Sequence, residues 1–445
     1  MKDLLERRFQ LRRRKTTVGT EIIAGLTTFA TLSYILAVQP SIMADAGMNP
    51  LGVFAATAIV SGLVTIAMGL FSNTPFALAP GMGDNILLAY VLVAGGICTW
   101  QQGLGFMFIA GAIFVLLSAF RVREKIAGYL PRSIKFGLSA ALGIMLFQIG
   151  IANSEILLTG NNGWNDFSLP AVQLTFIGLA ITLILSFLTI RIRGKSYKIR
   201  GAILISIVLT TLIGIPFGLV KFDFNINLGR TFSSLGDVAF KLDILGVLKP
   251  AFIGLIIITF IGDFSSTLGT ALGAGNKAGL MDADGNMPML GKIFLVDSVG
   301  TVFGTLMGCT VVTSYAESAS GVEAGGRTGL TSVVTGLLFL VSLVLAPIFI
   351  AIPNAATAPA LIIIGISMMQ ELRTLDFNLL DWTPVAMMVG FTAFGDLVIG
   401  ITAGLVSDVV IRLSSFAFNS ERKKGDLPSI PTIILAAIMC LQYII

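Results

Sequence analysis

Apolar stretches long enough to cross a bilayer recur along the whole chain, and this repetition limits its folds more than any other feature. A transmembrane α-helix needs about 20 mostly apolar residues to span the hydrocarbon core. Of the 445 residues, 55% are hydrophobic and only 12% are charged, which is about half the charged fraction of an ordinary soluble domain. The sequence therefore predicts an all-α polytopic membrane protein and excludes a soluble multidomain architecture.

The apolar stretches give about fourteen candidate membrane spans, seven on each side of a polar stretch at 221–243. The first seven lie near 22–40, 52–71, 75–96, 103–120, 132–152, 171–191 and 201–219. The second seven lie near 246–270, 291–309, 312–325, 329–351, 358–372, 382–397 and 399–417. We expect two domains of seven spans, 1–220 and 244–418. The remaining segment, 419–445, carries a basic loop and an apolar stretch at 427–445 that is either a further span or an interfacial helix.

Basic residues gather in clusters between spans, which predicts the orientation of the chain. The clusters at 121–135, 191–200 and 277–292 each follow an even-numbered span, and cytoplasmic loops carry the excess of Lys and Arg. The arginine-rich stretch at 7–15 precedes the first span. We therefore expect a multi-pass protein of the cell membrane with a cytoplasmic N-terminus, and the net charge of +5 needs no nucleic-acid partner to explain it.

The two halves resemble each other in sequence. GVFAATAIVSGLVTIAMG (52–69) aligns without a gap with GKIFLVDSVGTVFGTLMG (291–308), and 129–145 aligns more loosely with 351–368. Because seven spans is an odd number, the second copy must be inverted in the membrane. Inverted repeats that hold a solute near the midplane are a recurring design of secondary transporters, although channels also contain repeats.

Two segments at matching places in the halves are interrupted. SNTPFALAPGMGDNILLAY (72–90) contains Pro75, Pro80, Gly81 and Gly83, and the segment 310–330 is similarly broken by small residues. Extended backbone at membrane depth is tolerated only where protein or water satisfies it. We expect a short extended stretch and a half-helix in spans 3 and 10, whose helix N-termini face a polar solute. A kinked structural span is the alternative.

Two carboxylates are the main candidate site residues. Glu317 lies at the break in span 10, and an acid at membrane depth is a functional candidate by default. Asp263 lies in an apolar run, followed at helical spacing by Ser266, Thr267 and Thr270. Such a polar stripe can also serve only to hydrogen-bond neighbouring helices.

Further candidates surround these two acids. Thr31 belongs to a weaker polar stripe on the first span, and Asp84 follows the PGMG break, where it could cap the half-helix. Ser314 and Ser318 flank Glu317 in sequence. We expect Thr31, Thr267, Ser314 and Ser318 to contribute hydroxyl groups to the solute site.

Cofactor chemistry has little support in this sequence. It contains no histidine, the usual neutral-pH proton carrier and commonest metal ligand. Its three cysteines, Cys98, Cys309 and Cys440, suggest neither a metal site nor a disulfide framework. We expect no cofactor, no metal and no enzymatic activity, and carboxylates must carry any proton chemistry.

Three segments together resemble a known family: AGLTTFATLSYILAVQP (24–40), PFALAPGMGDN (75–85) and TSYAESASGVEAGGRTGLT (313–331). They are similar to the purine permeases of the nucleobase–cation symporter family, in the azaguanine–hypoxanthine–guanine–adenine branch. The resemblance implies fourteen spans in two inverted repeats, divided into a core and a gate domain, and proton-coupled uptake of a purine base. It further implies that Asp263 and Glu317 bind the base and that Phe76 forms an aromatic wall.

Three positions depart from the pattern of this branch. Ser266 stands where a second aspartate is usual, Asp84 stands at a usually apolar position, and Gln39 replaces an asparagine. One acid is thus lost from the site region and one gained. We hypothesise that Asp84 partly replaces the missing carboxylate and joins Glu317 and Asp263 in proton coupling.

The sequence thus favours a proton-coupled transporter of adenine, guanine or hypoxanthine. Alternatives are a transporter of xanthine, uracil or an anion on the same fold, a channel, or an intramembrane aspartyl enzyme. Two acids at the site disfavour an anionic solute, and the identity of the coupling ion and a homodimeric state are left open.

Overall fold

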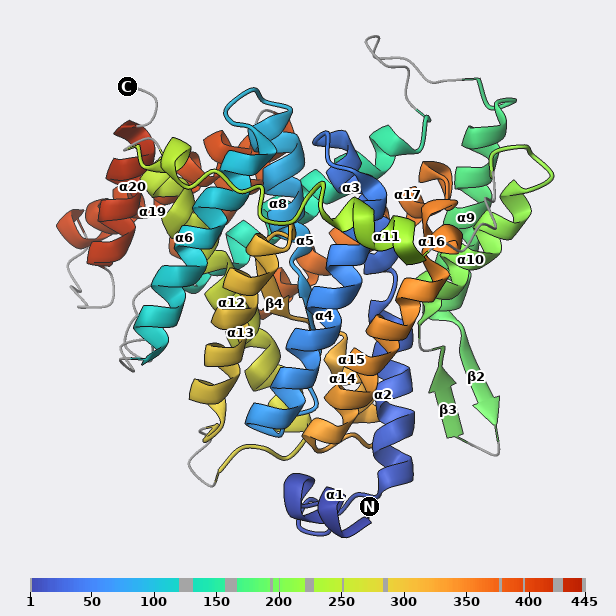
Figure 1. The fold of residues 1–445 in the computed structure, drawn as a ribbon. Coiled ribbons are helices and arrows are strands. Elements are labelled where there is room, and N and C mark those ends of the chain that lie inside the picture. The colour runs from blue at the N-terminus through green and yellow to red at the C-terminus, as the bar shows by residue number, and fades with distance from the viewer. Residues whose placement is uncertain are drawn as a thin grey trace.

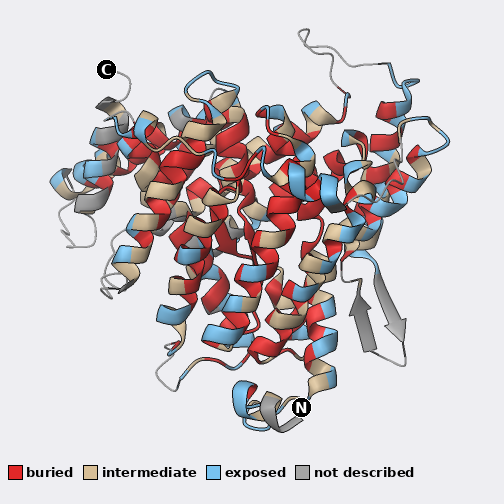
Figure 2. Ribbon diagram, viewed as in Figure 1, coloured by how far each residue is buried: buried red, intermediate tan, exposed pale blue. Residues whose placement is uncertain are grey.

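The computed structural model describes residues 2–119, 131–156, 166–192, 195–199, 201–220, 228–249, 252–282, 287–375, 378–394, 397–418 and 427–441. Long helices run roughly side by side through the molecule, and the short helix α1 (Lys2–Phe9) lies across one end of the bundle (Figure 1). Buried residues fill the centre of the bundle (Figure 2), while large apolar side chains such as Phe187 and Ile184 are exposed on its outside. An apolar outer surface is suited to lipid rather than water.

The first half of the chain alternates long helices with short irregular elements. These are α2 (Val18–Leu32), α3 (Ile35–Asp45), α4 (Pro50–Ser72), β1 (Leu78–Pro80), α5 (Met82–Ile86), the π-helix η1 (Leu87–Val93), α6 (Trp100–Ala119), α8 (Arg132–Asn153), α9 (Pro170–Phe187), β2 (Thr189–Ile192), β3 (Lys195–Lys198) and α10 (Ala202–Gly214).

The second half repeats this alternation after a connecting region. The connecting region holds α11 (Leu228–Leu235) and η2 (Leu245–Val247). The helices and strands that follow are α12 (Ile253–Lys277), α13 (Leu290–Leu306), β4 (Val312–Ser314), α14 (Ser318–Glu323), α15 (Gly329–Val341), η4 (Ser342–Leu345), α16 (Ala346–Ile350), α17 (Asn354–Met368), η5 (Met369–Thr374), α18 (Leu379–Phe394), α19 (Leu397–Phe418) and α20 (Ile430–Leu441).

Each of the fourteen predicted stretches contains helical residues, so the prediction of a helical membrane protein is confirmed. Within the described residues, eight helices are long and apolar enough to cross a membrane, and four shorter apolar helices accompany them. The stretch at 427–445 contains the helix α20.

A helix and a β-hairpin were not predicted from the sequence. The helix α11 forms inside the polar stretch 221–243, and β2 and β3 form an antiparallel hairpin that overlaps the basic stretch 191–200. Tertiary contact accounts for α11, because Asn49, which caps α4, donates a hydrogen bond from Nδ2 to Asp237 just beyond it (2.7 Å).

Glycine pairs bring α4 and α15 into close contact. A Cβ atom on Gly69 would lie 2.3 Å from the carbonyl oxygen of Gly329, and one on Gly336 would lie 2.5 Å from that of Gly62. Small residues let helix backbones approach where hydrophobic driving force between helices is weak, as in membranes. These two contacts fix α15 against α4, directly beside the segment that leads to β1.

Candidate functional site

Two short strands from opposite halves of the chain pair at the centre of the candidate site. β1 and β4 are antiparallel, with Leu78 opposite Ser314, Ala79 opposite Thr313 and Pro80 opposite Val312. Backbone hydrogen bonds from Tyr315 to Ala77 (3.0 Å) and from Gly81 to Val311 (2.8 Å) extend the pairing. Each strand leads into a short helix, α5 or α14. The predicted extended breaks in the two matching segments are therefore confirmed, and the structure adds that they contact each other.

Threonines of the preceding helices satisfy the backbone of each strand in the same way. Thr65 of α4 accepts from the Leu78 amide (2.9 Å) and donates to the Leu78 carbonyl (3.0 Å). Thr301 of α13 accepts from the Val312 amide (3.1 Å) and donates to the Val312 carbonyl (3.0 Å). An unpaired backbone group inside a membrane costs several kcal/mol. These hydroxyls therefore allow extended backbone at a depth where helix is the rule.

Glu317 lies immediately before α14 and receives a hydrogen bond from the first span. Its Oε1 accepts from the hydroxyl of Tyr34 (2.9 Å), and Tyr34 itself is buried between α2 and α3. The neighbouring Ser318 accepts from the amide of Ala77, just before β1 (3.0 Å). The Glu317 turn thus connects α14 with the first span and with β1.

Asp263 lies on α12 and is only 3% exposed. Its Oδ2 accepts from the hydroxyl of Thr301 (3.3 Å), while its Oδ1 is buried without a hydrogen-bond partner. Thr267, one turn on, donates to Asp297 (2.8 Å) and accepts from the amide of Ser314 (3.2 Å). Asp263 is therefore held against α13, the helix that also supports β4, with one acceptor unused.

Asp84 lies in the first turn of α5 with its carboxylate folded back toward β1. A Cβ atom on Gly81 would lie 2.6 Å from Asp84 Oδ2. Asp84 and Asp297 are both close enough to Asp263 to interact with it electrostatically, and Tyr315 interacts with both Asp84 and Glu317. The structure thus brings the candidate acids Asp84, Asp263 and Glu317 into one region. Within the described residues, the ion pairs include none of these three.

The other predicted site residues differ in how open they are. Phe76 is fully buried, with its ring close to Gly275 of α12, so it presents no exposed wall in this conformation. The hydroxyl of Thr31 donates within its own helix to Thr27 (3.0 Å) and Thr28 (2.9 Å). Ser314 is buried, and its hydroxyl has no partner. Ser266 is exposed at the edge of the face that buries Asp263 and Thr267.

A buried acid on the first span, Glu21, was not predicted from the sequence. Glu21 is fully buried and accepts from the amides of Arg327 (2.9 Å) and Thr331 (3.2 Å) and from the hydroxyl of Thr331 (2.6 Å). It therefore satisfies free amides at the N-terminus of α15, a favourable position for an anion. Its partners lie about three hundred residues away in the chain, so no local sequence pattern predicts these hydrogen bonds.

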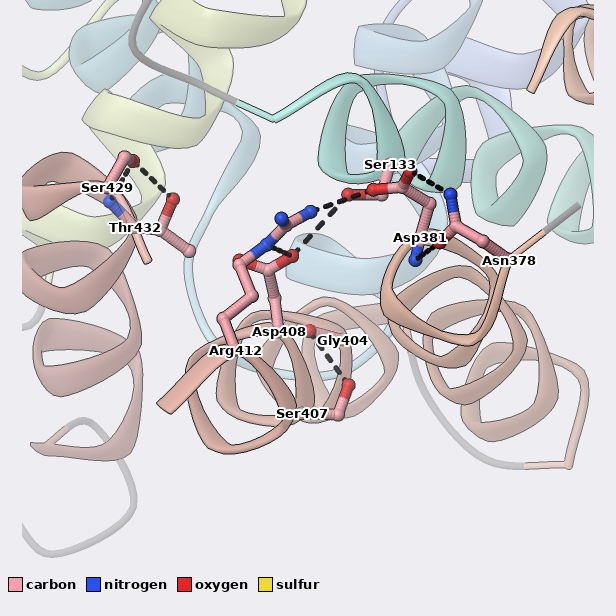
Figure 3. Close-up of polar contacts among 9 residues, drawn as sticks. All are labelled: Ser133, Asn378, Asp381, Gly404, Ser407, Asp408, Arg412, Ser429 and Thr432. Carbon is pink, nitrogen blue, oxygen red and sulfur yellow. Dashed lines mark hydrogen bonds and ion pairs between the residues drawn. The ribbon is translucent and has the colours of Figure 1, made fainter. Parts of the chain in front are cut away.

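An ion-pair cluster among α8, α18 and α19, built around the buried Asp408 and Arg412, was also missed (Figure 3). Arg412 donates from Nε to Asp408 (2.9 Å) and from an NH2 group to Asp381 (2.8 Å). Ser133 at the start of α8 donates to Asp408 (3.4 Å), and Asn378 donates to Asp381 (2.9 Å). The spacing of Asp408 and Arg412, four apart in an apolar run, was a signal that could have identified the pair.

Residues 19–409 of the chain match the sequence pattern of the xanthine/uracil permease family. The chain belongs to this family. The chain is therefore a membrane transporter and not an enzyme. In the part of the chain that the structure describes, no group of three His, Cys, Asp or Glu side chains is arranged to hold a metal ion.

Several relatives of the permease carry substrate names. Adenine permease AdeQ of Escherichia coli K12 is 35% identical over 419 residues, covering 92% of this chain and 90% of its own. Guanine/hypoxanthine permease PbuO of Bacillus subtilis is 32% identical over 424 residues, covering 91% of this chain and 94% of its own.

Solved structures support the fold. The transmembrane domain of the cyanobacterial bicarbonate transporter BicA matches with a TM-score of 0.58 and 16% identity, covering 88% of this chain and 97% of its own. The structure of SLC26A9 matches with a TM-score of 0.66 and 14% identity, covering 89% of this chain and 65% of its own. At such low identity these likenesses concern the fold and not the solute.

Proposed function

We propose that this permease takes up a purine nucleobase together with protons across the cell membrane. The observation that carries the proposal is the pair of acids, Asp263 and Glu317, beside the paired strands β1 and β4 and outside the ion pairs of the described residues. Relatives that match over most of the chain are named adenine and guanine/hypoxanthine permeases. A neutral, hydrogen-bonding solute suits acids that have unused acceptors better than an anion does.

Recognition of the base rests on complementary hydrogen bonds. A purine offers N–H donors and ring-nitrogen acceptors at the edge of a flat ring. The unpartnered Oδ1 of Asp263 can accept one N–H, and the unpartnered hydroxyl of Ser314 lies on the strand beside it. Hydrogen bonds to a charged acceptor are roughly twice as strong as neutral ones. These two groups together would select a base over an apolar solute of the same size.

Proton coupling rests on Glu317. Tyr34 donates to one carboxyl oxygen of Glu317, which leaves the other oxygen able to carry a proton and donate it to a ring nitrogen. Loss of that proton on the cytoplasmic side removes the donor and releases the base. Asp84, electrostatically linked to Asp263, would supply the negative charge that Ser266 does not provide.

We infer that the architecture is two inverted repeats of seven spans, 1–220 and 244–418, with a cytoplasmic N-terminus. The matched roles of Thr65 and Thr301 and the antiparallel pairing of β1 with β4 support an inverted repeat. In such transporters one domain rocks against the other around a fixed site near the midplane. A homodimer stays a prediction.

The test is uptake of labelled adenine, guanine, hypoxanthine, xanthine and uracil by cells without their own permeases, with and without a protonophore. We expect saturable purine uptake that collapses with the protonophore and with Glu317→Gln. The matched control is Glu323→Gln, because Glu323 is an exposed acid at the other end of the short helix α14 that Glu317 precedes, paired with Lys277 at 2.8 Å. Uptake of sulfate or bicarbonate and of none of the bases, with the protein confirmed in the membrane, would replace the purine proposal with anion transport.

A further inference from the structure

A groove of about 490 Å³ opens on the outside of the bundle between α4 and α13. Its volume falls within the range of roughly 300–1,000 Å³ that is usual for ligand pockets. Its walls are apolar and include Leu63 (44% exposed), Phe71 (51%) and Val299 (49%). Val64 packs against Gly300 and closes the floor of the groove. A Cβ atom added to Gly300 would lie 2.6 Å from Val64 Cγ1. The groove faces outward, away from the strands and the candidate acids.

Two cations lie at one end of this groove. Arg8 of α1 lines it, and the Lys292 ammonium at the start of α13 lies 5.9 Å from the centre of the Phe71 ring. Both side chains are exposed, and the ion pairs among the described residues use neither. The nearby acid Glu6 is engaged by the amide of Arg12 (3.2 Å). An apolar groove with two exposed cations at one end, outside the ion pairs among the described residues, is complementary to an anionic amphiphile.

We propose that the groove binds one acyl chain of an anionic glycerophospholipid, with the lipid phosphate between Arg8 and Lys292. The outward apolar walls face the region where lipid tails lie, and basic residues at the membrane surface attract anionic headgroups. A peptide segment would leave backbone polar groups unsatisfied against walls of leucine, valine and phenylalanine. The lipid comes from the leaflet on the side of α1, which lies at the end of the bundle where α4 ends and α13 begins (Figure 1).

Lipid in the groove would reinforce the framework of the candidate site. The acyl chain of the lipid would lie on the Val64–Gly300 contact. The residues next to these two, Thr65 and Thr301, hold β1 and β4 through hydrogen bonds. Occupancy therefore stabilises the relative position of α4 and α13. This proposal does not depend on the identity of the transported solute.

Native mass spectrometry of the purified full-length protein tests the proposal, with phosphatidylglycerol and phosphatidylcholine of identical acyl chains as probes. We expect preferential retention of phosphatidylglycerol and a melting temperature that rises with it. Each cation should contribute about fivefold to the affinity, from roughly 1 kcal/mol per basic residue near a membrane surface. Arg8→Gln with Lys292→Gln should therefore weaken retention about 25-fold, whereas the matched control Arg7→Gln, on an exposed neighbouring residue, should not.

A second variant separates the groove from surface charge. Ala67 is exposed on α4 and lines the groove, so Ala67→Phe should fill it and abolish retention with both cations intact. The control is Ile184→Phe, at an exposed apolar position of α9. Melting in lipid-free detergent checks that each variant folds. Equal retention of the two lipids, or phosphatidylglycerol binding that survives Ala67→Phe in a folded protein, would overturn the proposal.

Discussion

Two groups of acids, each with one buried and one partly buried member, differ in what neutralises them. Asp408 and Asp381, near α8, share the guanidinium of Arg412, with Nε and NH2 each 2.8–2.9 Å from a carboxylate (Figure 3). Asp263 and Glu317, beside β1 and β4, receive hydroxyl groups such as those of Thr301 and Tyr34, and the ion pairs among the described residues include neither acid. A buried charge is costly unless it is paired and hydrogen-bonded. The acids of the first group therefore have a structural complement within the chain, while those of the second must find theirs in a proton or a solute.

The largest expected effect breaks the paired group. Arg412→Gln leaves Asp408 buried without its cation, and removing one partner of a buried ion pair costs about 3–5 kcal/mol. We expect a large fall in melting temperature and in the amount of folded protein, measured by fluorescence-detected size exclusion after heating. The double variant Asp408→Asn with Arg412→Gln should recover most of the stability, because the fully buried Asp408 is then neutral and the remaining acid, Asp381, is partly exposed (27%). A double variant as unstable as the single one would contradict a structural role for the pair.

For Asp263 and Glu317 we expect the opposite pattern: little change in melting temperature and a large loss of uptake. Glu317→Gln and Asp263→Asn remove an acceptor that has no cation partner, so each should leave the melting temperature nearly unchanged. Uptake should fall about tenfold to a hundredfold, since one hydrogen bond to a charged group is worth about 1.5–3 kcal/mol. Uptake per folded molecule is the measurement. A variant that melts far below the parent protein and transports normally once folded would show that these acids are structural, like Asp408.

A smaller effect is expected at Asp84, and it sharpens the contrast within the site. Asp84→Asn keeps the shape of the side chain and removes a charge that interacts with Asp263. We expect about a tenfold loss of uptake, because one unit of pKa difference between two protonation states corresponds to about 1.4 kcal/mol of interaction and Asp84 would no longer share in proton coupling. The matched change Ser266→Asp should restore uptake if one acid near Asp263 is what the site needs. Unchanged uptake in Asp84→Asn would rule out the compensation hypothesis.

The sequence predicted the parts of this structure that depend on local pattern. Apolar runs located the helices, and the Pro and Gly residues around Pro80 located the extended break, because both follow from the chemistry of a few neighbouring residues. The pairing of β1 with β4 and the Tyr34–Glu317 hydrogen bond join residues more than 230 apart in the chain. Glu21 resembled an ordinary acid in a first helical turn. Only the packing of α2 against α15 gives it a role.

The last prediction tests whether the hydroxyl of Tyr34 is a true substitute for a cation. Tyr34→Phe removes the hydrogen bond to Glu317 and leaves the buried ring in place. A neutral hydrogen bond contributes about 0.5–1.5 kcal/mol, so we expect a loss of uptake of a few-fold to tenfold and a small change in melting temperature.

The pH dependence of uptake distinguishes two roles of the Tyr34 hydroxyl: it either stabilises ionised Glu317 or only positions the Glu317 side chain. If Tyr34 stabilises ionised Glu317, its removal favours the protonated acid, and the alkaline limb of the uptake profile should shift to higher pH. The control Tyr90→Phe removes a hydrogen bond from an exposed pair, to Asp45 (2.6 Å), and should leave that limb in place. An identical profile in Tyr34→Phe would mean that the hydroxyl only positions the side chain. In that case the solute or the proton would be the sole complement of Glu317, and the contrast with Arg412 would be sharper still.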